Sequence, residues 1–318
     1  MVLVYSDNKK LAFELLSKAA EISKETKNEV IAAIIGKNDE TYAKELVSYG
    51  ADKVYIAENE SETTKAEEYC EILENIITET KSEIILIGSN KNGKEIASRL
   101  AGKLNAGCVI DATDVSLDAG KVTVKRVVYS GNAISVQQFQ TTPAIITVPS
   151  KVFDPIDADS SRKGKIEKKA ISPKKSTSTI TNISEKVTGD VNVEEAEIIV
   201  SCGRGFKDKS DIKLADELAT ALKGKTVGCS RPIAADLKWL PEDHWIGLSG
   251  HKVKPKLYVA AGISGQIQHI AGMRDSSVVV AINKDADALI FNSADYGIVG
   301  DLYSVLPKLT KAIKEKMG

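Results

Sequence analysis

The sequence is poor in the residues that bind metals or form disulfides. Its 318 residues include three histidines and four cysteines, and the cysteines lie far apart at Cys70, Cys108, Cys202 and Cys229. No CxxC pair and no Cys/His cluster with zinc spacing occurs, which argues against a zinc centre or a disulfide framework. We therefore expect no metal ion and four reduced, buried thiols.

Net charge and long apolar runs are also missing. Forty-three Lys and Arg residues stand against forty-four Asp and Glu residues, so no overall field favours nucleic acid or an anionic membrane. The N-terminal stretch MVLVYSDNKK reaches Asp7 after a few apolar residues, and no apolar run approaches the length of a membrane span. We expect a cytoplasmic protein with no nucleic-acid partner and no membrane insertion.

Short apolar runs that alternate with amphipathic segments fill the first half of the chain. The strand-like runs are VLVYS (2–6), VIAAII (30–35), KVYIA (53–57) and IILIG (84–88). Between them, apolar residues recur at helical spacing, as at Leu11, Leu15 and Ile22. Nearly all-apolar strands between amphipathic helices are typical of a parallel sheet covered on both faces. The pattern predicts a doubly wound α/β domain.

The pattern changes near Val122. The runs VTVKRVVYSG, AISVQQFQ and AIITV are rich in β-formers and are punctuated by glycine and proline, which indicates hairpins or edge strands. We expect them to complete a first domain over residues 1–150. Residues 151–190 mix Pro, Ser, Lys and Asp without sustained periodicity, which is typical of a linker or crossover.

The α/β alternation returns over residues 191–318. The strand-like runs are EIIVSCG (197–203), TVGCS (226–230), WIGLS (245–249), LYVAAG (257–262) and VVVAIN (278–283). Leu214, Leu218 and Leu222 mark one face of a helix, and a last helix is expected at about 301–316. We predict a second doubly wound domain with a mainly parallel sheet.

The loops after these strands are candidates for ligand binding, because ligands of open parallel sheets lie at the carboxyl ends of the strands. Gly203-Arg204-Gly205 begins like a dinucleotide fingerprint, but Asp208 replaces the third glycine, so a simple tight turn is an equal interpretation. Ser230-Arg231-Pro232 puts an arginine in the first turn of a helix, where the helix dipole disfavours it; either another group holds it or it is a solvated surface residue.

The stretch Gly262-Ile263-Ser264-Gly265 is the best candidate for an anion cradle, since glycines allow close backbone approach. The alternative is a serine N-cap flanked by glycine. Gln266 and His269 follow at helical spacing, and Asn283 comes at the end of a buried strand, as ribose-binding groups often do. The loop 247–251, GLSGH, adds flexible backbone and a hydroxyl donor.

Together these loops resemble the α subunit of the electron transfer flavoproteins. The resemblance is closest over LYVAAGISGQIQHIAGMRDSSVVVAINKDADALIFNSADYGIVGDL (257–302), and it is looser in the first half, through IILIGSNKNGKEIASRLAGKLNAG. It implies a heterodimer with a β subunit against which the first domain packs, and one FAD in the C-terminal domain. It also implies a carrier that takes electrons from flavin dehydrogenases, such as the acyl-CoA dehydrogenases of fatty acid β-oxidation, and passes them to a membrane quinone reductase.

The resemblance further implies a set of FAD-binding residues: Arg204, Ser230, Arg231, Gly247, Ser249, Gly262, Ser264, Gly265, Gln268, His269, Asn283 and Asp301. Arg231 would lie by the isoalloxazine, Ser249 near N5, and His269 at the C2 carbonyl side. A donor or cation at that side favours the anionic, one-electron-reduced flavin. Ser264, Gly265 and Gln268 would bind pyrophosphate and ribityl oxygens, and Asn283 and Asp301 the adenosine end. Arg204 would lie close to the flavin or the pyrophosphate.

Four positions depart from the residues common in the family: Trp245 and Leu248 replace glutamines, Ser249 replaces threonine and His251 replaces lysine. The pocket should therefore be less polar on one side. Trp245 is alternatively a core residue or a partner-facing one, and His244 and His251 are expected to face solvent.

Two other functions compete with the flavin carrier. A nicotinamide-dependent oxidoreductase or transhydrogenase component would require an intact GxGxxG motif after a first strand, and this fingerprint is missing. A cofactor-free interaction subunit would use residues 262–265 only as a capped helix start. No triad or acid/base dyad is apparent, which favours a carrier over a substrate-transforming enzyme. Whether the β subunit holds AMP or a second, bifurcating FAD depends on another chain.

Overall fold

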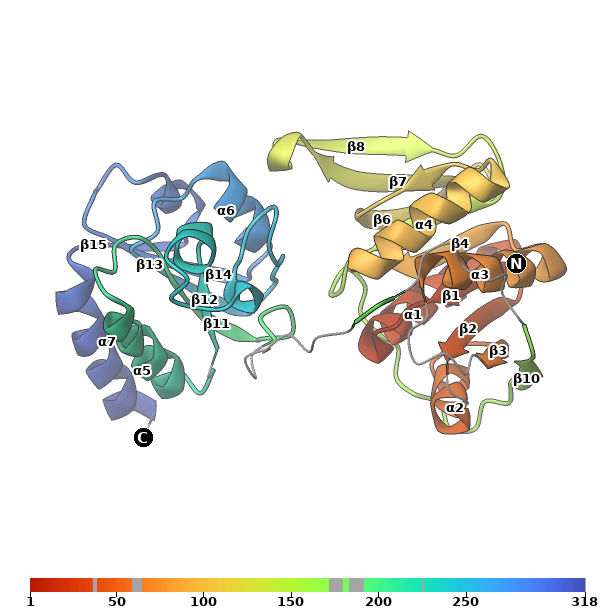
Figure 1. Ribbon diagram of the computed structural model, residues 1–318, viewed down its shortest axis with the longest axis horizontal. Helices are drawn as coiled ribbons and strands as arrows, with labels where there is room; N and C mark the ends of the chain where they lie inside the picture. The colour runs from red at the N-terminus through yellow and green to blue at the C-terminus, as the bar shows by residue number, and fades with distance from the viewer. Residues whose placement is uncertain (37–38, 59–64, 172–179, 183–191, 225, 318) are drawn as a thin grey trace. The chain divides into compact units, whose positions relative to one another are not determined.

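The computed structural model describes residues 1–36, 39–58, 65–171, 180–182, 192–224 and 226–317. The chain divides into two compact units, residues 1–183 and 184–318. Each unit has a parallel sheet with helices on both faces (Figure 1). The predicted fold class, two α/β domains with mainly parallel sheets, is confirmed.

The first unit contains a seven-stranded parallel sheet in the order β10-β3-β2-β1-β4-β9-β5. Its strands are β1 (Val2–Tyr5), β2 (Val30–Gly36), β3 (Lys53–Glu58), β4 (Ile84–Gly88), β5 (Cys108–Val109), β9 (Ala144–Val148) and β10 (Lys165–Lys169). Its helices are α1 (Lys9–Thr26), α2 (Glu40–Ser48), α3 (Ala66–Thr80) and α4 (Lys91–Leu104). Successive residues of a strand point to opposite faces, so Val4 packs with α1 and α2 while Leu3 packs with α3 and α4.

A separate antiparallel sheet joins β6 (Ala112–Asp118), β7 (Lys121–Val128) and β8 (Ala133–Gln138), with the short 3₁₀ turn η1 (Tyr129–Gly131) between the last two. One of its faces packs on the core of the first unit through Val115 and Val124, which are fully buried. The other face carries Val127, Ile134 and Val136, whose exposed fractions are 39, 66 and 63%. The hairpin expected for VTVKRVVYSG and AISVQQFQ is confirmed.

Two parts of the sequence prediction for this region are wrong. AIITV is no edge strand, because β9 is buried over its whole length and pairs in parallel with β4 and β5. Residues 165–169, which were expected in a linker, form β10 and extend the first sheet beside β3. The sequence KIEKK lacks apolar alternation because β10 is an edge strand whose contacts are partly ionic, such as Lys53 with Glu167 at 3.0 Å.

The second unit has a five-stranded parallel sheet in the order β12-β11-β13-β14-β15. Its strands are β11 (Ile198–Cys202), β12 (Val227–Cys229), β13 (Leu257–Ala261), β14 (Val278–Asn283) and β15 (Tyr296–Val299). Its helices are α5 (Lys213–Ala221), α6 (Ile267–Met273) and α7 (Leu302–Met317), and the short turns are η2 (Lys209–Ile212), η3 (Pro232–Asp236), η4 (Glu242–His244) and η5 (Leu289–Ser293).

Helices α5 and α7 cover one face of this sheet, and α6 with η5 covers the other. The run WIGLS, predicted as a strand, is a loop that makes only isolated bridges, Cys229 with Trp245 and Ile246 with His251. Ile246 is buried because the loop packs over the α6 face and this side chain joins the core there, whereas Trp245 is half-buried and Leu248 is exposed. Burial without strand pairing looks the same in sequence as a short strand.

The order of the strands places a switch point in each sheet. In the second unit, the chain leaves β11 toward β12 on one side and returns to β13 on the other. In the first unit, the same reversal occurs between β1 and β4. Loops that leave adjacent strands in opposite directions open a crevice at the carboxyl ends of the strands, which is where ligands bind in such folds.

Candidate functional site

At the switch point of the second unit, the loops after β11 and β13 pack backbone against backbone. The Gly203 N–H donates to the Ala261 carbonyl at 2.9 Å, and the Gly205 N–H donates to the Gly262 carbonyl at 3.0 Å. A Cβ on Gly203 would stand 2.2 Å from the Gly262 oxygen. The two loops can approach this closely only because the residues in contact are glycines. The approach leaves the exposed Arg204 side chain at the edge of the crevice.

The loop from β13 to α6 is bent by glycine and pressed against η5. Gly265 has φ +83°, and a Cβ there would stand 2.1 Å from the backbone nitrogen of Ile290. That nitrogen donates to the Ser264 carbonyl at 3.1 Å. The alternative of Ser264 as an N-cap is wrong, because the N-cap of α6 is Gln266 and no side chain caps it. The exposed Ser264 side chain is therefore available to a ligand.

The loop after β12 carries a buried serine that is hydrogen-bonded to β11 and an arginine that is exposed. The Ser230 N–H donates to the Cys202 carbonyl at 2.9 Å, and the residue is buried. Arg231 is exposed, and its guanidinium carbon lies 5.9 Å from the centre of the Trp245 ring. This cation–π distance explains how an arginine is held at a helix start that disfavours it. Trp245, half-buried, thus has a place in the site.

The loop 245–251 touches α6 through its backbone. The Leu248 N–H donates to the Gln268 carbonyl at 2.7 Å, and a Cβ on Gly272 would stand 2.5 Å from the Gly247 Cα. This contact brings Gly247 and Ser249 beside Gln268. The side chains of Ser249 and Gln268 are both exposed.

His269 points away from solvent, into the core between α6 and the sheet. Its Nε2 lies 2.9 Å from the Tyr258 hydroxyl, and both side chains are buried. Burial lowers the pKa of His269 to about 4, and the Ile246 carbonyl opposes this only in part. The imidazole is therefore neutral at physiological pH, which favours the role of donor over that of cation. Among the described residues, its Nδ1 has no hydrogen-bond partner.

The two residues assigned to the adenosine end also organise the protein. The Asn283 amide donates to the Ile263 carbonyl at 2.9 Å, and its Oδ1 accepts the Asp285 N–H at 3.0 Å. Asp301 is exposed and precedes α7, where its Oδ1 accepts the Tyr303 N–H at 3.3 Å. Asn283 thus ties the loop after β14 to the loop after β13.

The twelve candidates lie along one end of one sheet, in the loops after its strands, on α6 (Gln268 and His269) and at the end of β14 (Asn283). Arg231 follows β12 at one edge of the sheet, and Asp301 follows β15 at the other edge. The glycine loops after β11 and β13 lie between them. Four strand spacings separate these edges, which is about 19 Å. Glycine loops at the centre, exposed polar side chains along the edge and one orphaned buried imidazole nitrogen fit an extended dinucleotide such as FAD.

Sequence reasoning missed Tyr258 and Gly272. Tyr258 looked like one residue of a buried strand, and only its contact with His269 separates it from the core. His244, expected to face solvent, is buried with its Nδ1 2.6 Å from the Val227 carbonyl. His251 is half-exposed and its Nδ1 lies 2.9 Å from Glu194.

The cysteines are free thiols, and their placement gives them no part in the site. Cys202 and Cys229 face each other across β11 and β12, fully buried. Burial raises the pKa of both thiols, that of Cys229 to about 12, so neither ionises at physiological pH. The part of the chain that the structure describes holds no group of three or more side chains suited to a metal ion.

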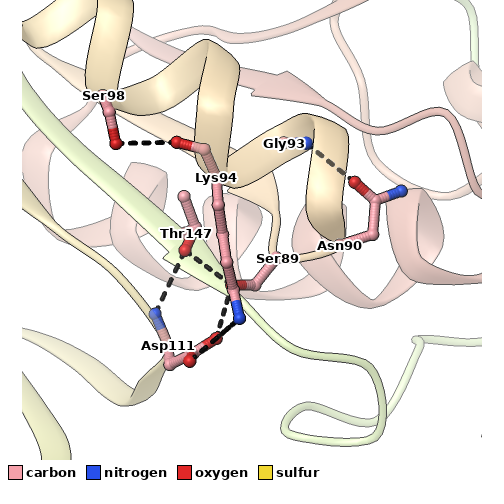
Figure 2. Close-up of polar contacts among 7 residues, drawn as sticks. All are labelled: Ser89, Asn90, Gly93, Lys94, Ser98, Asp111 and Thr147. Carbon is pink, nitrogen blue, oxygen red and sulfur yellow. Dashed lines mark hydrogen bonds and ion pairs between the residues drawn. The ribbon is translucent and has the colours of Figure 1, made fainter. Parts of the chain in front are cut away.

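Next to the switch point of the first unit, the protein's own side chains fill the carboxyl ends of β4, β9 and β5. In the GSNKNGK loop, the Asn90 Oδ1 accepts the Gly93 N–H at 2.7 Å and caps α4 (Figure 2). The Lys94 ammonium lies 2.9 Å from the Asp111 carboxylate, which also accepts from the Ser89 hydroxyl at 2.7 Å. Thr147, fully buried, accepts the Asp111 N–H at 3.1 Å. The carboxylate neutralises the lysine that a phosphate would need.

No helix among the described residues is long and apolar enough to cross a membrane.

The family models and the relatives that match this chain agree on a single family. The family model of the electron transfer flavoprotein domain matches residues 2–174, and that of the electron transfer flavoprotein FAD-binding domain matches residues 192–274. The chain is 40% identical to the electron transfer flavoprotein subunit alpha of Bacillus subtilis over 96% of this chain and 93% of that one. It is 38% identical to the subunit alpha of Thermoanaerobacterium thermosaccharolyticum, over 96% and 93% of the two chains. It is 36% identical to the protein FixB of Escherichia coli O1:K1, over 98% and 97%.

Proposed function

The chain belongs to the electron transfer flavoprotein α-subunit family, and we propose that it is the FAD-bearing subunit of a heterodimeric electron carrier. FAD is its cofactor, because the second unit carries the FAD-binding domain of the family. The observation that supports a carrier best is the crevice across the sheet of the second unit. It has glycine loops where a ligand backbone must approach closely, and polar side chains at intervals along its length.

We propose that FAD lies along this edge with its isoalloxazine toward β12 and its adenosine toward β15. The residues that would contact it are Arg204, Ser230, Arg231, Gly247, Ser249, Gly262, Ser264, Gly265, Gln268, His269, Asn283 and Asp301. At the flavin end, Arg231 supplies a cation and the loop 247–249 supplies a hydroxyl and backbone amides. At the centre, Ser264 and the N–H groups of the β13–α6 loop suit the pyrophosphate. Asp301 suits a ribose hydroxyl.

FAD supplies the redox chemistry, and the chain's own residues set its environment. Arg231 is held over Trp245, so its charge stays near the flavin end instead of moving freely in solvent. A fixed cation favours electron uptake by a group that becomes negatively charged. The mixed character of this end, with exposed Leu248 beside exposed Ser249, suits a carrier that shields the flavin without offering an acid or base to a substrate.

We propose that the first unit docks the β subunit through the outer face of its antiparallel sheet. Val127, Ile134 and Val136 form one apolar patch there, because Val127 pairs with Ile134 and Lys125 with Val136 across β7 and β8. Tyr129, 81% exposed, extends the patch at η1. Apolar side chains grouped this way on one sheet face are typical of a protein interface. Because the chain belongs to an α-subunit family, the partner that we propose for this patch is the β subunit.

The electron donors and acceptors belong to the same proposal. The donors would be flavin dehydrogenases such as acyl-CoA dehydrogenases, the acceptor would be a membrane quinone reductase, and the complex would work in the cytoplasm. The family membership supports this assignment. The net charge of −1 gives the chain no strong field for nucleic acid.

The test is the flavin content of the purified complex. The chain is co-expressed with its β subunit, and the visible spectrum and acid-released flavin per complex are measured. We expect one FAD, loss of colour on reduction, and reoxidation by a quinone reductase. The Arg231→Ala variant should bind FAD about tenfold more weakly, equivalent to about 1.4 kcal/mol, with Lys308→Ala on α7 as the control. A complex that stays colourless with saturating FAD would refute the proposal, and two FAD per complex would indicate bifurcation.

A further inference from the structure

The pair Tyr258 and His269 joins the core of the second unit to the candidate FAD site. Tyr258 lies on β13, on the face that α6 covers, and His269 lies on α6. Figure 1 labels both elements. The hydroxyl and the imidazole Nε2 are 2.9 Å apart. Tyr258 is fully buried and His269 is 6% exposed, so water does not compete for this contact.

Both groups are neutral at physiological pH. Burial raises the pKa of the Tyr258 hydroxyl, and burial lowers the pKa of His269 to about 4. No charged side chain among the described residues forms a hydrogen bond to either group. The neighbours that act on them are the Ile246 carbonyl on the imidazole, and the Ser201 hydroxyl and the thiols of Cys202 and Cys229 on the tyrosine.

A neutral imidazole carries one proton, which can lie on Nε2 or on Nδ1. The tyrosine can donate only if Nε2 is bare, which puts the proton on Nδ1. With the proton on Nε2 instead, Nδ1 would be a buried lone pair and the Tyr258 proton would lose its acceptor on the ring.

We propose that Tyr258 is a positioning residue of the flavin site: its hydroxyl donates to Nε2 of His269 and keeps the imidazole proton on Nδ1. The inference rests on the proposed function. Nδ1 is the nitrogen without a hydrogen-bond partner among the described residues, so its N–H is the group left to bind a cofactor. His269 then offers a neutral donor to a flavin carbonyl, and its strength as a donor is set by a residue that does not itself touch the flavin.

The other two histidines cannot take this role. His244 Nδ1 lies 2.6 Å from the Val227 carbonyl, and His251 Nδ1 lies 2.9 Å from Glu194. In both, Nδ1 is already engaged by the chain.

The direct test is the position of the proton. The full-length chain, labelled with ¹⁵N-histidine and paired with its β subunit, is studied by long-range ¹H–¹⁵N correlation, which separates the two tautomers. His269→Gln and His251→Gln identify the signals of the three histidines. We expect a wild-type His269 with Nδ1 protonated and Nε2 bare, unchanged between about pH 6 and about pH 8, where an unperturbed imidazole titrates. Protonated Nε2 in the wild type overturns the proposal, whatever the variants do.

The Tyr258→Phe variant removes only the hydroxyl. We expect the signal of the pure Nδ1–H form to be lost and both tautomers to appear. The matched control is Tyr55→Phe, because Tyr55 is equally buried but lies in the first unit, with its hydroxyl 3.5 Å from Glu79. A Tyr258→Phe variant with an unchanged His269 tautomer would overturn the positioning role.

A second readout separates positioning from simple structural support. The reduction potential of bound FAD should shift in Tyr258→Phe and stay unchanged in Tyr55→Phe, with equal flavin content in both. An unshifted potential with an altered tautomer would overturn the link to the flavin. If the wild-type complex binds no FAD, the proposed function fails on that ground, while the tautomer measurement on the flavin-free complex still decides the Tyr258 inference.

Discussion

Gly203→Ala tests the claim that the site depends on direct backbone contact between the loops after β11 and β13. The new Cβ would stand 2.2 Å from the Gly262 oxygen, 2.7 Å from the Gly262 carbonyl carbon and 2.7 Å from the Ile263 Cα. All three are backbone atoms, so no side chain can turn aside. Gly203 has no positive φ, so steric overlap is the main cost.

Overpacking a close contact costs about 1–3 kcal/mol, and a contact made only of backbone belongs at the upper end, about 3 kcal/mol. The matched control is Gly300→Ala, which lies after β15 at the same end of the sheet. Its Cβ would meet only the Val305 Cγ2, at 3.1 Å, and this methyl group can move. We expect that control to stay within about 1 kcal/mol of the wild type.

The assay is urea unfolding of the full-length chain followed by tryptophan fluorescence. Both tryptophans, Trp239 and Trp245, lie in the second unit, so the signal reports that unit alone. With an m-value of about 1–3 kcal/mol per molar, a loss of about 3 kcal/mol lowers the midpoint by about 1–3 M. Gly203→Ala should also reduce the FAD content of the complex. A midpoint equal to that of Gly300→Ala would refute the reasoning.

Three further predictions concern other parts of the chain. Because the pKa of His269 is lowered from 6.5 to about 4, the unfolded chain binds a proton at higher pH than the folded chain, so stability is retained above pH 6.5 and is lost as pH falls toward 4. Over that range His269→Gln should remove about 3 kcal/mol of the wild-type decline in unfolding free energy measured by tryptophan fluorescence, with His251→Gln as control; equal declines would contradict it. Ile134→Asp should abolish co-purification with the β subunit while far-UV circular dichroism stays native, whereas Leu237→Asp on the second unit should not; retained pairing in Ile134→Asp would remove the interface proposal. Asp111→Ala should destabilise the first unit by about 2 kcal/mol, and Asp111→Asn by less, because the carboxylate bridges Lys94 and Ser89; circular dichroism during urea unfolding would show it, and a loss no larger than for exposed Asp118→Ala would count against this bridge.

Much of the fold could be predicted from local patterns. The apolar runs at 84–88 and 278–283 coincide with β4 and β14, because strands buried on both faces have no polar alternation to obscure them. The edge strand β10 and the loop 245–249 were misassigned for the opposite reasons. Strand β10 has a single apolar residue, Ile166, and the loop 245–249 buries Ile246 without pairing as a strand.

The candidate site, like the fold, could be predicted from the sequence only in part. The residue types and their order in the loops are properties of the sequence, and so is the family, since the stretch 257–302 needs no structure to be matched. The contacts that hold those residues in place join elements that are far apart in the chain. Arg231 meets Trp245 through packing of two loops, and Asn283 reaches Ile263 across neighbouring strands.

The protonation state of His269 is the plainest case. In the sequence it is a histidine at helical spacing after a glycine loop, open to a role as donor or cation. Burial against β13 and the hydroxyl of Tyr258 make it a neutral donor, because removing an imidazole from water penalises its charged form. Sequence periodicity determined which elements form and where the loops lie, since it records local burial. Tertiary structure alone decided which groups meet in those loops and which protons they carry, since both depend on distances that no local pattern encodes.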